Sequence, residues 1–269
     1  MGRLIVENIQ IKIKKLIDDF YMKSSTLAYA NLNENKKYSG WVSDFHLKTK
    51  SGEKINLNLN NEYELFLLFV LAIAWSRSGR WENAPYLISH IKHECIIDIN
   101  YWKNSENIEN EIKNRKYNAK NITNNVSGIN PRIKISFRKD IFNSIKILAN
   151  KWDEIFKKLK ESNNVVEYKA FIEYLSKIKG LGCGNNTIFI KIPLILRELR
   201  CQNIFPNIPG ELCCVIDKRV DNACKIIGLE TPSAYNSIKP WIFYSKLVYK
   251  HFNDLYDIPL FAYKDIYDI

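Results

Sequence analysis

The chain has 269 residues, of which 46% are hydrophobic and 13% aromatic, and 40 Lys and Arg stand against 29 Asp and Glu, a net charge of +11. This composition excludes a mainly disordered chain and suffices for the core of one large domain or two small ones. No apolar run is long enough to cross a bilayer, and residues 1–20 lack a signal-peptide cleavage pattern. We therefore expect a cytoplasmic monomer with no membrane partner.

The positive charge makes a polyanion the leading class of partner. Asn and Ile are heavily used, as in NAKNITNNVSGIN, which also indicates an AT-rich coding background that increases the Lys content. The charge alone therefore fits both a polyanion-binding protein and an excess of basic residues that only increases solubility.

Residues 1–136 are expected to form a helical N-terminal lobe with a small β element. Apolar positions recur close to every 3.6 residues over 4–20, which predicts an amphipathic helix. Residues 41–60 alternate around a Lys-Ser-Gly-Glu break, which predicts a β-hairpin. The segment 64–77 is apolar on all sides and predicts a buried core helix. Residues 103–132 are polar and Asn-rich, which is typical of a surface loop or insertion.

Residues 137–269 are expected to form a second, helical part that packs with the first into one compact unit. The periodicity predicts an amphipathic helix with a lysine-rich face over 140–161. A glycine hairpin is expected at 180–184, and Gly228 has the position of a C-terminal helix cap. Further helices are predicted over 165–177, 186–200, 217–227 and 240–252. The fold class is therefore mainly α.

The hairpin carries the pattern Gly182-x-Gly184-x-Asn186-Thr187, directly before a predicted helix. Two glycines permit a tight turn and leave consecutive N–H groups unobstructed at a helix N-terminus, which is a phosphate-binding geometry. A Gly-x-Gly pattern by itself also fits an ordinary turn.

A second motif, Ile216-Asp217-Lys218-Arg219-Val220, follows the apolar, strand-like run Leu212–Ile216 and begins the next predicted helix. Asp217 has the position of an N-cap residue, so the motif has a purely structural interpretation. It also has a chemical one, because a helix N-terminus keeps a carboxylate ionised.

Together the two motifs resemble the helix-hairpin-helix DNA glycosylase superfamily, in which a Gly-x-Gly-x-Lys-Thr hairpin is followed by Val-Asp-x-His/Arg-Val and a helix ending in Gly-Leu. The matching residues are Gly182, Gly184, Asn186, Thr187, Ile216, Asp217, Arg219, Val220, Gly228 and Leu229. The resemblance covers residues 170–250 and is nearest the archaeal 8-oxoguanine glycosylase branch, where a proline-containing loop also precedes the aspartate. It implies a two-lobed helical fold that binds double-stranded DNA.

The resemblance implies that Asp217 stabilises the oxocarbenium-like sugar as the glycosidic bond breaks, and orients or deprotonates the attacking water. Bifunctional members attack the sugar with a lysine amine, and Asn186 stands at that position here. Lys191 lies further along, on a different face of the predicted helix. The residues thus favour a monofunctional glycosylase that leaves an abasic site, with Asp217 and Asn186 in the catalytic site. A bifunctional 8-oxoguanine-type glycosylase/lyase is the alternative.

The DNA contacts implied by the family involve the hairpin and the starts of two helices, at Gly182, Gly184, Asn185, Thr187, Lys191, Lys218 and Arg219. Lys179 and Arg197 are expected to add salt-dependent affinity. The target base must leave the stack, and Trp241, Phe243 and Tyr244 are candidates for its pocket, with a role in the core as the alternative. Candidates for the cleft or the duplex wedge are Trp75, Arg77, Arg80 and Trp81.

No cofactor or metal centre is expected. No cysteine follows Cys224, so the iron–sulfur cluster of some glycosylases is not expected, and the hairpin carbonyls could hold a monovalent cation as in family members. The six cysteines are expected to be buried thiols, and the four histidines form no ligand group. These residues are Cys95, Cys183, Cys201, Cys213, Cys214, Cys224, His46, His90, His93 and His251.

The substrate stays open between two kinds of base. Ser237 or Ile238 lies where the archaeal branch has the acidic residue that reads the damaged guanine. One alternative is repair of an oxidised or alkylated base; the other is antiviral removal of a hypermodified phage base such as glucosylated hydroxymethylcytosine. Two alternatives come from other functional classes. One is a non-catalytic DNA-binding module, and the other is a basic RNA-binding or protein-interaction protein.

Overall fold

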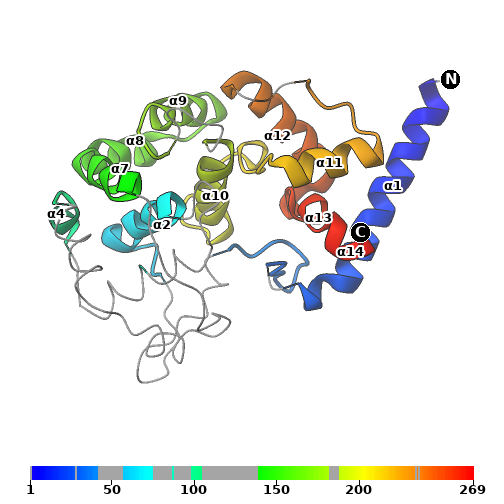
Figure 1. The fold of residues 1–269 in the computed structure, drawn as a ribbon, viewed down its shortest axis with the longest axis horizontal. Helices are drawn as coiled ribbons and strands as arrows, with labels where there is room; N and C mark the ends of the chain where they lie inside the picture. Colours follow the sequence, from blue (N-terminus) through cyan, green and yellow to red (C-terminus); the bar gives the residue numbers. More distant parts are fainter. Residues whose placement is uncertain are drawn as a thin grey trace. The chain divides into compact units, whose positions relative to one another are not determined.

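The computed structural model describes residues 2–27, 29–41, 57–74, 87, 98–104, 139–181, 188–233, 235 and 237–269. These residues are mainly helical and contain no sheet, which confirms the predicted mainly α class (Figure 1). An isolated antiparallel bridge joins Leu32 and Tyr38. Most of the predicted hairpin at 41–60 and of the insertion at 103–132 lies outside the described ranges.

The chain forms two compact units, and the first combines both of its ends. Unit 1 contains residues 1–44 and 196–269, and unit 2 contains residues 45–195. The boundary that we expected after residue 136 falls inside unit 2, in a segment outside the described residues. The ends of the chain belong together because the N-terminal helix packs on the C-terminal helices.

Unit 1 is built around the amphipathic N-terminal helix α1 (Gly2–Lys23). This helix buries Ile13, Leu16 and Phe20, at helical spacing, and confirms the helix predicted over 4–20. It contacts α11, α13 and α14, and in Figure 1 the blue α1 and red α14 lie side by side. The other elements of the unit are η1 (Ser24–Thr26), η3 (Gly210–Leu212), α11 (Lys218–Ile227), α12 (Ile238–Phe252), η4 (Asn253–Leu255), α13 (Ile258–Phe261) and α14 (Tyr263–Tyr267).

Unit 2 has the apolar helix α2 (Glu62–Ala74) at its centre. Every residue from Leu65 to Ala74 is buried, which confirms the predicted core helix. The Trp152 ring meets Phe66 and Phe69 edge-on at centroid distances of 5.2 Å each. The other helices of the unit are α4 (Ile99–Trp102), α7 (Lys139–Asn150), α8 (Trp152–Glu161) and α9 (Val165–Ser176), while α10 (Ile188–Cys201) begins in unit 2 and ends in unit 1. None of the described helices is both long and apolar enough to cross a membrane.

The single helix predicted over 140–161 is wrong, because the chain forms α7 and α8 with Lys151 between them. The Lys151 N–H is shared between the carbonyls of Ile147 and Leu148, at 3.2 and 3.1 Å. Asn150 Nδ2 also donates to the Lys146 carbonyl at 2.8 Å. Such a local side-chain hydrogen bond competes with the regular backbone hydrogen bonds of a helix. The apolar period of the sequence nevertheless continues across the break at Lys151.

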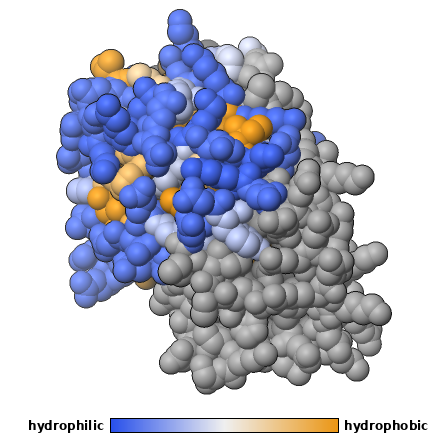
Figure 2. All heavy atoms as spheres, turned by 90° about the vertical axis from the view of Figure 1, so that its left-hand side faces the viewer, coloured by the Kyte–Doolittle hydropathy of each residue, from blue (hydrophilic) through white to orange (hydrophobic). Residues whose placement is uncertain are grey.

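The lysine-rich face predicted for this region does face solvent. Lys151, Lys157 and Lys160 are exposed, while Ile155 and Leu159 are buried. Hydrophilic residues cover most of the described surface on the side of α7, α8 and α9, with apolar residues scattered among them (Figure 2). The helices predicted over 165–177, 186–200, 217–227 and 240–252 correspond to α9, α10, α11 and α12.

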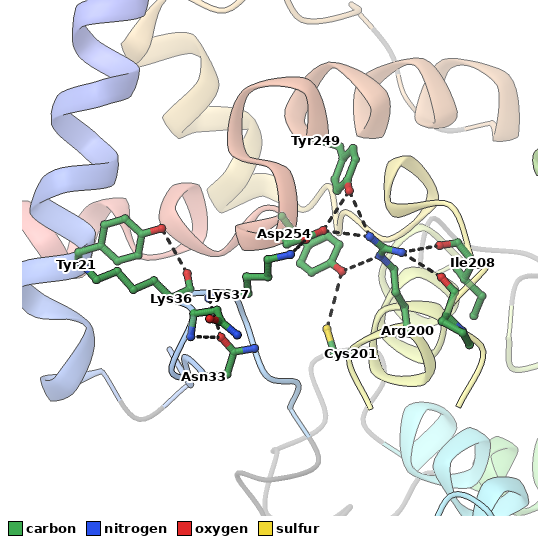
Figure 3. A network of polar contacts seen from close by, with 12 residues as sticks. Tyr21, Asn33, Lys36, Lys37, Arg200, Cys201, Ile208, Tyr249 and Asp254 are labelled. Atoms are coloured by element: carbon green, nitrogen blue, oxygen red, sulfur yellow. Dashed lines mark hydrogen bonds and ion pairs between the residues drawn. The ribbon is translucent and has the colours of Figure 1, made fainter. Parts of the chain in front are cut away.

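Arg200, near the end of α10, is the centre of a polar network in unit 1 (Figure 3). Its Nη1 donates to the carbonyls of Pro206 and Ile208 at 3.1 and 3.2 Å. Its Nε donates to Tyr256 Oη and its Nη2 to Asp254 Oδ1, both at 3.1 Å. The planar guanidinium thus connects the proline-containing loop to η4 and to Tyr256, which follow α12.

Candidate functional site

Asp217 caps helix α11 as its sequence position predicted. Its backbone is extended, and its Oδ1 accepts a hydrogen bond from the Val220 N–H at 2.9 Å. The side chain is half-buried. Within the described part of the chain, Oδ2 has no hydrogen-bond partner. One carboxylate oxygen therefore stabilises the helix N-terminus, and the other is available for chemistry.

The segment that leads to Asp217 is buried and held by side chains from distant parts of unit 1. The strand-like run predicted over Leu212–Ile216 forms no strand. Instead, the Cys214 N–H donates to Ser245 Oγ at 3.2 Å, and the Val215 N–H donates to Asp257 Oδ1 at 2.7 Å. Two backbone N–H groups before Asp217 are thus bonded by a side chain of α12 and by the N-cap residue of α13.

Asp257 is itself part of a buried ion pair. Arg197 Nη1 donates to Asp257 Oδ1 at 2.7 Å, and both side chains are almost fully buried. The guanidinium also lies over the Tyr38 ring, 4.9 Å from its centroid. Burial raises the pKa of Asp257, against the opposing charge of Arg197. Arg197 is therefore a core residue, and our expectation that it adds salt-dependent DNA affinity is wrong.

A second carboxylate, Asp221, lies one helical turn after Asp217. Its Oδ1 accepts from Tyr244 Oη at 3.0 Å and its Oδ2 from Lys225 Nζ at 2.5 Å. The half-buried Tyr235 packs edge-on against the Tyr244 ring at 5.6 Å. Burial and the charges of Asp221 and Asp217 raise the pKa of Tyr235. Tyr235 therefore lies within electrostatic reach of both carboxylates.

Sequence reasoning missed four of these residues, namely Tyr235, Asp221, Ser245 and Asp257. Asp221 carried a usable signal, because a residue at i+4 from Asp217 lies on the same side of a helix. The other three lie far along the chain from Asp217, and only the tertiary structure shows that they approach this region.

The three residues predicted for the base pocket differ in their exposure to solvent. Trp241 is 1% exposed and Tyr244 is fully buried, whereas Phe243 is 60% exposed. Trp241 and Tyr244 share the inner face of α12 and belong to the core. Phe243 lies on the surface, and the base-pocket role of the three residues stays a prediction.

The structure does not describe the hairpin residues Gly182, Gly184, Asn185, Asn186 and Thr187, nor Trp75, Arg77, Arg80 and Trp81. The predicted hairpin contacts and any cation there lie outside the described residues.

Next to the hairpin, Gly180 has a φ of +92° and Leu181 is buried. Lys191 is only 2% exposed, and its Nζ donates to the Gly180 carbonyl. The predicted DNA contact through Lys191 is therefore not available in this structure, because the ammonium is buried.

The basic residues at the start of α11 differ in their contacts. Lys218 is exposed. Arg219 Nη2 forms an ion pair with Asp265 Oδ2 at 2.8 Å, and its guanidinium lies 4.2 Å from the Phe261 ring centroid. Lys179, at the other motif, is exposed. Lys218 and Lys179 can meet a phosphate as they stand, whereas Arg219 must leave its carboxylate.

The described cysteines are free thiols, and Cys213, Cys214 and Cys224 are buried. Burial raises the pKa of Cys201 to about 11. No group of three or more His, Cys, Asp and Glu side chains that could hold a metal ion occurs within the described ranges. Cys95, Cys183, His46, His90 and His93 lie outside those ranges.

No protein-family model matches the chain, and no curated protein or solved structure is significantly similar to it.

Proposed function

We propose that the chain is a monofunctional DNA glycosylase in which Asp217 is the catalytic carboxylate. The proposal depends on one observation above all, the half-buried position of Asp217 at the N-terminus of α11. The N-terminal end of a helix is where an acidic side chain interacts favourably with the helix dipole. The free Oδ2 can face a developing positive charge while Oδ1 keeps the helix capped.

In the proposed reaction the target nucleotide leaves the stack and its glycosidic bond breaks towards an oxocarbenium-like sugar. Asp217 stabilises that charge, and a water molecule that it orients attacks the sugar carbon. The base departs with the electrons of the glycosidic bond, the attacking water passes a proton through Asp217 to that base, and an abasic site remains. Asn186 has no amine for the covalent route, and the buried Lys191, bonded to the Gly180 carbonyl, also supports water as the nucleophile.

A non-catalytic DNA-binding module is the second candidate. The Asp217–Val220 hydrogen bond favours it, because this cap is by itself a complete structural role for the aspartate. The net charge of +11 fits DNA binding in both cases.

Base release from DNA separates the two candidates. The substrates are duplexes with 8-oxoguanine, uracil or an alkylated base, and phage DNA with glucosylated hydroxymethylcytosine. Released bases are identified by mass spectrometry, and abasic sites are scored as strand breaks with and without alkali. The proposal expects release of one base, with breaks only after alkali. Breaks without alkali would contradict the monofunctional chemistry.

Asp217→Asn is the decisive variant because Asn caps a helix about as well as Asp but carries no charge. We expect base release to fall by at least about 100-fold while duplex binding is kept. Asp153→Asn, the same change in the first turn of α8, is the control and keeps wild-type release. No release by the wild-type protein from any substrate, with duplex binding retained, would favour the non-catalytic module.

A further inference from the structure

Helix α12 presents a strip of side chains to solvent that the proposed chemistry does not use. Lys239, Phe243, Lys246 and Lys250 are all exposed, at successive intervals of four, three and four residues. This spacing places them on one side of the helix. We call these four residues the α12 strip.

Phe243 is the unusual member of the strip. Among the exposed large hydrophobic side chains in the described residues it is the aromatic one, and 60% of its surface is accessible. The inner face of α12 is already filled by Trp241, Tyr244 and Val248, so Phe243 has no role in the core. An exposed aromatic ring between lysines is the combination that binds unpaired nucleic acid, where bases stack on the ring and ammonium groups meet phosphates.

The charge of the strip is largely unneutralised. Lys239 and Lys250 form no ion pair within the described ranges. Lys246 Nζ lies 3.6 Å from Glu211 Oε2, but the lysine side chain is 66% exposed, so this pair is weak. The strip itself contains no carboxylate. A polyanion therefore fits this face better than a protein surface that carries both acidic and basic side chains.

The length of the strip also fits a nucleic-acid strand. From Lys239 to Lys250 the helix rises about 16 Å, which equals the axial rise of roughly five stacked nucleotides. Several phosphates can therefore meet the three lysines at once, with a base over Phe243 between them.

We propose that the α12 strip binds an unpaired DNA strand, with Lys239, Lys246 and Lys250 on phosphates and Phe243 stacked on a base. The strand is unpaired because a duplex hides the faces of its bases. The choice of DNA over RNA rests on the proposed function, whereas the strip itself does not depend on catalysis by Asp217.

Phe243 is tested by fluorescence anisotropy of the full chain with a labelled 20-nucleotide single strand. Phe243→Ala should weaken binding roughly tenfold, and Phe243→Trp should keep it, because an indole also stacks. Ile11→Ala, at an exposed apolar residue of α1, is the matched control and leaves binding unchanged. Heparin has no bases, so Phe243→Ala should not change heparin affinity. Equal losses for heparin and DNA would overturn the stacking role.

The lysines are tested by the salt dependence of the same binding. Replacing Lys239, Lys246 and Lys250 by Gln should reduce the slope of log K against log salt by about 2, at about 0.7 per phosphate on a single strand. The control is the same triple replacement at the exposed lysines of α1 and α14, Lys12, Lys14 and Lys264. An equal reduction in the control would mean diffuse attraction and would overturn a site on α12.

Two further results decide the choice of ligand. Strip replacements that weaken binding to a matched duplex as much as binding to the single strand, or an RNA of the same sequence bound more tightly than the DNA, overturn the proposal. Base release is measured separately on these variants. If the wild-type protein releases no base yet binds single strands through the strip, the glycosylase proposal fails and this one stands.

Discussion

The Val215 N–H and the Arg197 guanidinium both donate to the same oxygen, Asp257 Oδ1, each at 2.7 Å. Arg197 lies on α10, and Val215 lies two residues before Asp217. One buried carboxylate therefore connects α10 to the segment that carries the candidate catalytic residue.

Asp257→Asn should destabilise the protein strongly. The amide keeps an acceptor for the Val215 N–H but leaves the Arg197 charge buried and unpaired, which costs about 3–5 kcal/mol in free energy of unfolding. Urea unfolding measures the loss. Arg197→Met in addition removes the unpaired charge, so the double variant should be more stable than Asp257→Asn alone. If Asp257→Asn lowers the free energy of unfolding by less than about 1 kcal/mol, the buried ion pair between Asp257 and Arg197 is contradicted.

The substitutions of Asp217 should affect the free energy of unfolding differently from the way they affect activity. Asp217→Ala loses the hydrogen bond to the Val220 N–H and should lower the free energy of unfolding by about 1 kcal/mol. Asp217→Asn keeps the cap and should unfold like the wild type. Both variants are compared by denaturant unfolding. Two equally destabilised variants would show that the charge, not the cap hydrogen bond, stabilises α11.

Two glycines with positive φ form a matched pair that separates backbone strain from steric conflict. Gly180 and Gly228 have φ values of +92° and +87°. A Cβ on Gly228 would be 3.6 Å from Ile9, whereas one on Gly180 would be 2.3 Å from Ser144 Cβ. Gly228→Ala should thus cost only the strain, about 1–2 kcal/mol. Gly180→Ala should cost clearly more, and thermal unfolding of both variants tests the order.

Asp254 should make the protein sensitive to acid. Burial works to raise its pKa, but hydrogen bonds from Lys37, Arg200 and Tyr249 together outweigh burial, so the folded pKa lies below the ordinary value of 3.8. A lowered folded pKa means that the stabilisation is complete above pH 3.8 and is lost as the pH falls through the folded value.

The measurement is the free energy of unfolding of the wild type and of Asp254→Asn between pH 6 and pH 2. The two curves should lie apart near neutral pH and converge in acid. Parallel curves over the whole range would show that Asp254 has the same pKa folded and unfolded.

Much of the local structure was predictable from the sequence because neighbouring residues carry the signal. The apolar period of α1, the wholly apolar α2, the Asp217 cap and the Gly228 C-cap each depend on residues within one or two turns of each other. The break at Lys151 was not predictable in this way, because the apolar period continues across it.

The candidate site was predictable only in part. The sequence pointed to Asp217 through its position before a helix, and the structure keeps it half-exposed there. It also pointed to Arg197 and Lys191 as surface cations, and both are buried. A lysine or arginine has the same local pattern in both situations, and only its distant partners decide between them.

The sequence by itself determined the helical class of the protein, most helix positions and the caps of α11, because these follow from periodicity and from backbone chemistry within a few residues. The tertiary structure decided that both chain ends form one unit, that Trp241 is core while Phe243 two residues later is surface, and that Asp257 supports the segment before Asp217. These outcomes depend on contacts between residues far apart in the chain, which no local pattern encodes.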